Sequence, residues 1–170
     1  VKEVNAKNVI ILPNNSNIIM TAQQTATILE DEVNVIVIPT KTIPQGLSAC
    51  VMYNPEVSLE DNIAEMEDAV ANVKTGQVTF AIKDTNIDGV EIKANDYMAL
   101  VEKDIVACKP NKCLEKLVDE DSELITLLVG EDVVDEEVEE IESYIEDNFD
   151  AEVDIIEGKQ PVYSFIIGVE

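Results

Sequence analysis

The amino-terminal part of the chain consists of two short apolar runs that flank one amphipathic stretch. The runs at 8–12 and 33–38 are rich in valine and isoleucine and are each followed by proline, which is typical of buried strands. Between them, residues 17–30 carry apolar side chains at three- and four-residue spacing, which predicts a helix capped by Ser16 or Asn17. Its apolar face consists of Ile18, Ile19, Ala22, Ala26 and Leu29. This order predicts a β-α-β unit.

The middle of the chain has a different pattern, in which apolar and polar residues alternate. The alternation at 77–83, together with the runs at 89–93 and 96–108, predicts antiparallel strands separated by turns. Helices are predicted at 47–53, 58–73 and 111–119. The second of these begins at Ser58, which has the side chain of a helix cap.

The carboxyl-terminal third repeats the plan of the first part. A strand at 124–130 precedes an amphipathic helix at 135–148, and further strands follow at 153–156 and 162–169. The buried face of this helix is predicted to consist of Val134, Val138, Ile141 and Ile145. These residues predict a second β-α-β unit.

Together the patterns predict an α/β fold in which two β-α-β units with parallel strands flank a more antiparallel middle section. A single domain is the expectation for 170 residues. Two subdomains, at about 1–74 and 75–170, are the alternative at this length.

Composition narrows the possible functions. The chain has 36 acidic residues against 11 lysines, with no arginine and a net charge of −25, so nucleic acid is not an expected partner. Without histidine it has neither a Ser-His-Asp triad nor a histidine-liganded zinc site. It also has no long apolar run and no basic leader, so we expect no membrane span and a cytoplasmic location. Because the first residue is Val1, we expect a fragment of a longer protein.

Two patterns bear on metal binding. Cys50, Cys108 and Cys113 are too few for a thiolate zinc site and are expected to be reduced thiols. Residues 84–89 match the opening of a calcium loop, but Asn95 stands where that loop requires a glutamate. A β-hairpin turn explains the same residues, and the missing glutamate favours it.

Two polar loops are expected where the first two strands end, because parallel strands leave a sheet at the same edge. The loops are 13–17 and 40–46. Their candidate contact residues are Pro13, Asn14, Asn15, Asn17, Thr40, Lys41, Thr42, Pro44, Gln45 and Gly46. The second loop lacks the glycine spacing of a phosphate-binding loop. Ordinary turns and helix caps use the same residue types, so both a structural loop and a contact surface remain open.

All eight charged side chains of the helix at 135–148 are carboxylates. Such a run usually forms a solvated helix face. It would also attract a basic surface of another protein.

Three segments carry a family resemblance. They are 9–18 with the sequence Pro-Asn-Asn, 35–46 with Pro-Thr-Lys-Thr-Ile-Pro-Gln-Gly, and 87–89 with Ile-Asp-Gly. In this order they resemble the C-terminal region of the catalytic subunit of bacterial fatty acid kinase. The resemblance extends to the apolar segment 162–170.

The resemblance implies a division of labour. In that family an N-terminal DhaL (dihydroxyacetone-kinase-like) domain binds ATP and magnesium, and a DegV-like fatty-acid-binding protein supplies the acyl chain that becomes an acyl phosphate. The C-terminal region docks that partner. The present chain would then be the docking part, with no catalytic, cofactor-binding or metal-binding residues of its own.

Two other interpretations remain open at the level of the sequence. The two loops could form a pocket in which an acyl chain or metabolite is sensed, so that the domain regulates the kinase. Acid-base catalysis by carboxylates and Lys41 has only the residue types in its favour.

Overall fold

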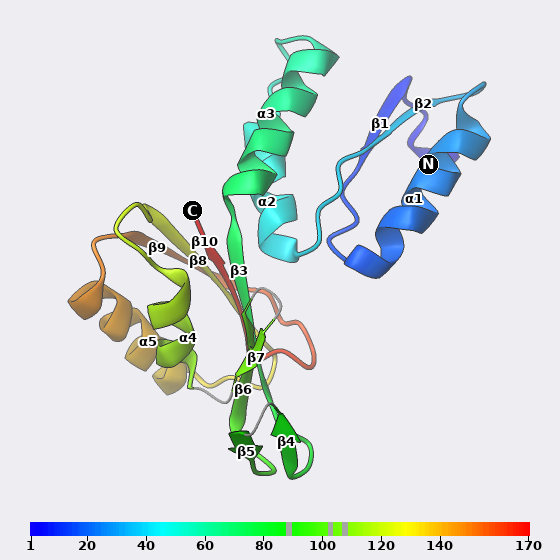
Figure 1. Cartoon of the computed structure of the whole chain (residues 1–170). Helices are drawn as coiled ribbons and strands as arrows, with labels where there is room; N and C mark the ends of the chain where they lie inside the picture. The colour runs from blue at the N-terminus through cyan, green and yellow to red at the C-terminus, as the bar shows by residue number, and fades with distance from the viewer. Residues whose placement is uncertain (88–89, 102–103, 107–108) are drawn as a thin grey trace. The chain divides into compact units, whose positions relative to one another are not determined.

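The chain forms two compact units in the computed structural model, Val1–Val73 (unit 1) and Lys74–Glu170 (unit 2). The structure describes residues 1–87, 90–101, 104–106 and 109–170. Unit 1 has a small parallel sheet, and unit 2 has a larger mixed sheet (Figure 1). Each sheet packs into a separate hydrophobic core.

Unit 1 opens with the predicted β-α-β arrangement. After a short 3₁₀ helix, η1 (Lys2–Val4), strand β1 (Asn8–Ile11) pairs in parallel with β2 (Asn34–Val37) over its whole length. Helix α1 (Ser16–Leu29) connects the two strands and packs against β2 (Figure 1). The first predicted β-α-β unit is therefore confirmed.

The cap of α1 is Asn15 rather than Ser16 or Asn17. Asn15 Oδ1 accepts a hydrogen bond from the backbone N–H of Asn17 at 2.9 Å, and Asn15 has an extended backbone with φ of −157°. A capping residue needs that non-helical backbone together with a short polar side chain. Asn14 precedes it with a left-handed φ of 54°, so the chain turns from strand to helix within a few residues.

Helix α2 (Ile43–Met52) begins earlier than the helix predicted at 47–53, so part of the predicted loop 40–46 is helical. Thr42 caps this helix, and its Oγ1 accepts the backbone N–H of Gln45 at 3.4 Å. Pro44 lies in the first turn, where a missing N–H removes no helical hydrogen bond. Proline and glycine also occur in loops, which is why the sequence pattern placed the helix start too late.

The core of unit 1 lies between the sheet and the helix pair. Helix α3 (Leu59–Asn72) begins at the predicted cap, Ser58, whose Oγ accepts the backbone N–H of Asp61 at 3.1 Å. It packs against α2. The buried core residues are Ile38, Ala49 and Met66, with Ile10, Leu12, Ile36 and Val70 packed around them.

Unit 2 is built on a six-stranded sheet with the order β7-β6-β3-β10-β8-β9. The strands are β3 (Lys74–Phe80), β6 (Tyr97–Val101), β7 (Asp104–Val106), β8 (Leu124–Val129), β9 (Glu152–Glu157) and β10 (Phe165–Val169). Strands β8 and β9 are parallel and are connected by α5 (Asp135–Asn148), whereas the other neighbouring strands are antiparallel. The predicted second β-α-β unit and the antiparallel middle section are both confirmed.

Helices α4 (Pro110–Leu117) and α5 pack on the same face of this sheet (Figure 1). Cys113 and Leu114 of α4 and Ile145 of α5 are fully buried against the strands. Val134 was predicted on the buried face of α5 but is 53% exposed. It has an extended backbone as the cap residue, so its side chain does not follow the helical spacing.

Two predicted strands of the middle section differ from the structure. The run 96–108 contains two strands, β6 and β7, which form an antiparallel pair with Val101 opposite Asp104. Strand β3 ends at Phe80 rather than continuing to residue 83. Ile82, which the alternation suggested would face a core, is 98% exposed.

The calcium-like motif lies partly within a separate two-stranded antiparallel sheet, β4 (Thr85–Ile87) with β5 (Val90–Ile92). Asp84 Oδ1 accepts the backbone N–H of Ala94 at 2.8 Å, so this carboxylate supports the hairpin. Asp88 and Gly89 of the motif lie outside the described residues, as does Cys108. Cys50 is exposed, whereas Cys113 is buried.

Candidate functional site

The segments that follow β1 and β2 lie together, as parallel pairing requires. The backbone N–H of Asn14 donates to Thr40 Oγ1 at 2.9 Å and joins the segment after β1 to the segment after β2. Thr40 is fully buried at this junction. Residues 13–17 and 40–46 therefore form one surface, which we call the β1–β2 edge.

Gly46 allows the close approach of α2 to Asn14. A Cβ atom at position 46 would lie 2.1 Å from Asn14 Oδ1 and 2.6 Å from Asn14 Cγ, well inside van der Waals contact. Asn14 Oδ1 is buried and has no hydrogen-bond partner within the described residues. The Asn14 side chain is thus positioned by packing against the first turns of α2.

Gln45 ties the β1–β2 edge to the helix pair. Its Oε1 accepts the backbone N–H of Lys41 at 2.8 Å. Its Nε2 donates to the backbone oxygen of Val70 in α3 at 3.4 Å. The backbone that carries Lys41 is therefore connected to both α2 and α3.

The predicted contact residues divide by exposure. The exposed residues are Asn15, Asn17 and Lys41, and the buried ones are Thr40, Pro44 and Gly46. The remaining four residues are partly buried: Pro13, Asn14, Thr42 and Gln45. The buried group shapes the edge, whereas the exposed group can contact another molecule.

An apolar strip on α2 continues from the edge. Ile43, Leu47 and Val51 follow one another at four-residue spacing, so they share one side of the helix. Their exposed fractions are 37%, 38% and 82%, respectively. An exposed strip of this kind is typical of a protein contact surface.

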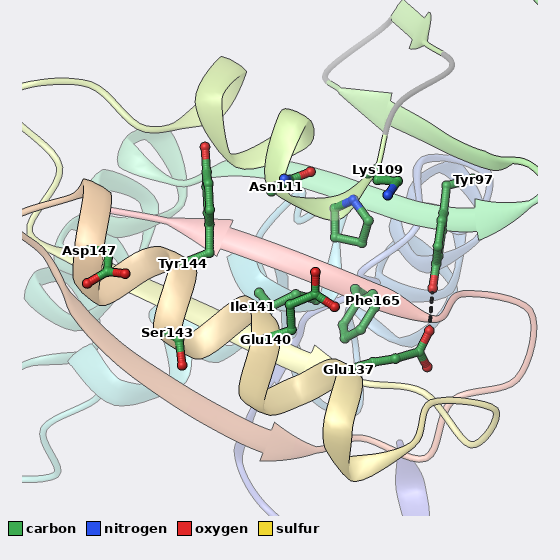
Figure 2. Close-up of a pocket in the computed structure, with 11 residues that line it drawn as sticks. Tyr97, Lys109, Asn111, Glu137, Glu140, Ile141, Ser143, Tyr144, Asp147 and Phe165 are labelled. Atoms are coloured by element: carbon green, nitrogen blue, oxygen red, sulfur yellow. Dashed lines mark hydrogen bonds between the residues drawn. The ribbon is translucent and has the colours of Figure 1, made fainter.

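Unit 2 contains a groove between α4 and α5 that the sequence patterns did not identify. Its volume is about 470 Å³, and it is lined by residues of β6, α4, α5 and β10 (Figure 2). Phe165, Ile141 and Pro110 are buried and provide an apolar floor. Glu137, Glu140 and Asp147 of α5 contribute carboxylates, with Lys109 as the cationic lining residue. We call this the α4–α5 groove.

One wall of the groove is held by a hydrogen bond between Tyr97 and Glu137. The Tyr97 hydroxyl donates to Glu137 Oε1 at 2.8 Å, as the dashed line in Figure 2 shows. Burial, and then this carboxylate, raise the pKa of Tyr97 well above its ordinary value of 10.0. The pair connects β6 to α5.

A second hydrogen bond connects α5 to α4. The Tyr144 hydroxyl donates to Glu115 Oε1 at 2.8 Å, and Lys112 Nζ donates to the same oxygen at 2.6 Å. The hydrogen bond from Lys112 and then that from Tyr144 hold the pKa of Glu115 below its ordinary value. The elements that border the groove are therefore fixed to one another.

Another hollow lies where β8 and β9 end and α5 begins. Its volume is about 500 Å³ and its walls include Val129, Val138 and Ile155. Its charged lining residues are Glu131, Asp135, Glu139, Glu157 and Lys159. Like the α4–α5 groove, it has more carboxylates than cations and is unfavourable for an anionic group.

The part of the chain that the structure describes has neither a metal cluster nor a membrane span. No group of three or more histidine, cysteine, aspartate or glutamate side chains in it is arranged to hold a metal ion. None of the helices it forms has the length and apolar character needed to cross a membrane.

Comparison with solved structures identifies the fold. The chain is similar to the DegV family protein Cg2579 of Corynebacterium glutamicum, with a TM-score of 0.66, 15% identity, and coverage of 99% of this chain and 76% of that one. It is also similar to the Streptococcus pneumoniae fatty acid kinase B3 protein loaded with linoleic acid, with a TM-score of 0.65, 14% identity, and coverage of 97% and 72%. At these identities the likeness concerns the α/β fold alone.

Comparison of sequences identifies the family. Protein YloV of Bacillus subtilis is 45% identical over 177 aligned residues, which include all of this chain and 32% of that protein. The chain thus spans about a third of the length of the curated relatives it matches. The family model for the C-terminal part of FakA-like fatty acid kinase subunits matches residues 1–170. The chain therefore belongs to the FakA-like C-terminal family of fatty acid kinase subunits.

Proposed function

We propose that this chain is the non-catalytic docking part of a fatty acid kinase. It binds a DegV-like fatty-acid-binding protein, whose acyl chain a DhaL domain elsewhere in the kinase phosphorylates with ATP and magnesium. The product is an acyl phosphate. The observation that carries the proposal is the β1–β2 edge, in a chain that belongs to the kinase subunit family.

The edge has the construction expected of a docking surface. Buried Thr40 and Gly46 hold two segments together, while Lys41 and Asn15 remain exposed beside them. A surface fixed before binding loses less conformational freedom when a partner associates. The adjoining apolar strip of α2 adds contact area that water would leave on binding.

Sensing of an acyl chain is the alternative function. The fold favours it, because the S. pneumoniae protein of similar fold is loaded with linoleic acid. The charges oppose it, because the α4–α5 groove and the hollow at the ends of β8 and β9 carry more carboxylates than lysines and would repel a fatty acid carboxylate. We therefore assign the acyl chain to the partner.

Calorimetry with the chain and a lipid-loaded DegV-like protein tests docking. The Lys41→Glu variant should bind more weakly, by about 1 kcal/mol or roughly fivefold, because it reverses an exposed charge at the proposed contact. The matched control is Lys7→Glu, which makes the same charge change on an exposed residue before β1. Its affinity should remain within about twofold of wild type.

Three outcomes would contradict parts of the proposal. Absence of binding by the wild-type chain would refute docking. Equal weakening in both lysine variants would show a general charge effect rather than a contact at the edge. An increase in melting temperature with free fatty acid, without binding of the carrier protein, would favour the sensor function.

A further inference from the structure

The α4–α5 groove combines an apolar floor with unpaired carboxylates. Phe165 is fully buried and Ile141 is 6% exposed beneath the space between the helices. The carboxylates of Glu140 and Asp147 are exposed, and neither forms a hydrogen bond or an ion pair within the described residues. In Figure 2 both lie along α5, and Glu140 directs its carboxylate toward α4.

The positions of these carboxylates set the spacing of a complementary ligand. Glu140 and Asp147 are separated by two helical turns, or about 10 Å along α5. Tyr144 lies between them on the same side and is fixed by Glu115. A ligand with two cations at this separation and apolar side chains between them would match the charges and contact the partly buried rings of Tyr97 and Tyr144.

We propose that the α4–α5 groove binds a basic amphipathic helix of a protein partner. Arginine or lysine at positions i and i+7 of that helix would pair with Glu140 and Asp147, and apolar residues at i+3 and i+4 would occupy the groove. This interaction goes beyond docking at the β1–β2 edge and does not depend on it.

Charge complementarity selects this occupant. A nucleic acid or an anionic lipid surface would be repelled by a chain with a net charge of −25. A free cation would make no apolar contact with the partly buried rings of Tyr97 and Tyr144, which also line the groove. Glu137 already accepts a hydrogen bond from the Tyr97 hydroxyl, and Lys109 lies at the same end of the groove. The cations of the ligand therefore pair with Glu140 and Asp147.

The test uses a designed helical peptide with arginines at i and i+7, leucines at i+3 and i+4, and alanine and glutamine elsewhere. Its binding to the whole chain is measured by fluorescence anisotropy at about 0.15 M salt, where charges more than about 8 Å apart are largely screened. Glu140→Lys should weaken binding about tenfold. The control Glu136→Lys, an exposed position one turn earlier and outside the groove, should weaken it less than about twofold.

Two further peptides separate the contributions of charge and apolar contact. Replacing both arginines by glutamine, or both leucines by serine, should each reduce affinity about tenfold or more. The proposal is wrong if the arginine peptide does not bind, or if Glu140→Lys and Glu136→Lys weaken it equally. Equal affinity of the glutamine peptide would also overturn it. Circular dichroism of both variants checks that they remain folded.

Discussion

Gly46 determines how closely the two segments of the β1–β2 edge can approach. In most helices alanine is favoured over glycine by about 1 kcal/mol, because glycine loses more backbone freedom on folding. Here the Asn14 amide occupies the space that a Cβ atom would need. The tertiary contact therefore outweighs the helix propensity.

Gly46→Ala should consequently destabilise the protein by about 2 kcal/mol, because either the Asn14 side chain or the first turn of α2 must move to make room for the new methyl group. Urea unfolding followed by circular dichroism measures the change. In an Asn14→Gly background the amide is absent, and the left-handed backbone of residue 14 suits glycine. There the same substitution should cost little or be stabilising, and an equal cost in both backgrounds would show that Asn14 is not the cause.

At the residue scale, the sequence pattern predicted that the two candidate segments adjoin, but not which of their residues are buried. It placed Asn14 and Thr40 at one sheet edge because parallel strands end together, and the structure joins them by a hydrogen bond. It did not distinguish buried Pro44 and Gly46 from exposed Lys41. That division depends on contacts between α2 and residues about 30 positions earlier in the chain, which no local pattern contains.

Among the elements, strong periodicity predicted helices well and weak local signals predicted their ends poorly. Helix α5 has the predicted bounds because its apolar spacing and charged face are regular. Helix α2 was predicted too short because Pro44 and Gly46 occupy its first turns. Strands β6 and β7 were merged because their connection at 102–103 carries no proline or glycine to mark a turn.

The Tyr97–Glu137 hydrogen bond links two elements, β6 and α5, and predicts an alkaline pH dependence. The pKa of Tyr97 is raised in the folded protein, so above pH 10.0 the unfolded chain loses this proton first. The contribution of this hydrogen bond to the free energy of unfolding is therefore complete below pH 10 and declines as the pH rises above 10. The Tyr97→Phe variant lacks the hydroxyl, so it has neither the hydrogen bond to Glu137 nor a group at this position that loses a proton.

Unfolding in urea between about pH 8 and about pH 11 should show this decline. At the lower pH, Tyr97→Phe should be less stable than wild type by about 1 kcal/mol. At the higher pH the difference should shrink. Tyr53→Phe, which removes a hydroxyl from a residue that is 51% exposed, should parallel wild type throughout. A constant difference for Tyr97→Phe would contradict the assigned role of the pair.

On the scale of the whole molecule, the α4–α5 groove shows why sequence patterns can miss a surface feature. Its lining comes from β6, α4, α5 and β10, which are far apart in the sequence. The acidic helix 135–148 indicated only that a basic partner could be attracted. The apolar floor of the groove became evident only in the structure, where Phe165 of β10 lies under α5.

The proposed division of labour predicts that this chain alone does not transfer phosphate. Phosphoryl transfer requires metal ions held by carboxylates next to a cradle for the nucleotide phosphates. With ATP, magnesium and a lipid-loaded DegV-like protein, the chain should form no acyl phosphate above a blank without it, as measured by mass spectrometry. Addition of a DhaL domain to the same mixture is the positive control. Turnover by the chain alone would contradict the proposed non-catalytic role.

The position of β10 affects how the protein is made. This strand follows all of its sheet neighbours in the chain, yet it lies between β3 and β8 and is buried along its length. During synthesis the ribosome must therefore release residues 165–169 before the two halves of the sheet can join. The β1-α1-β2 contacts of unit 1 are more local and can form while the rest is still being translated. Until β10 inserts, the nascent chain exposes two unpaired strand edges, and this is the stage at which it is most vulnerable to aggregation and proteolysis.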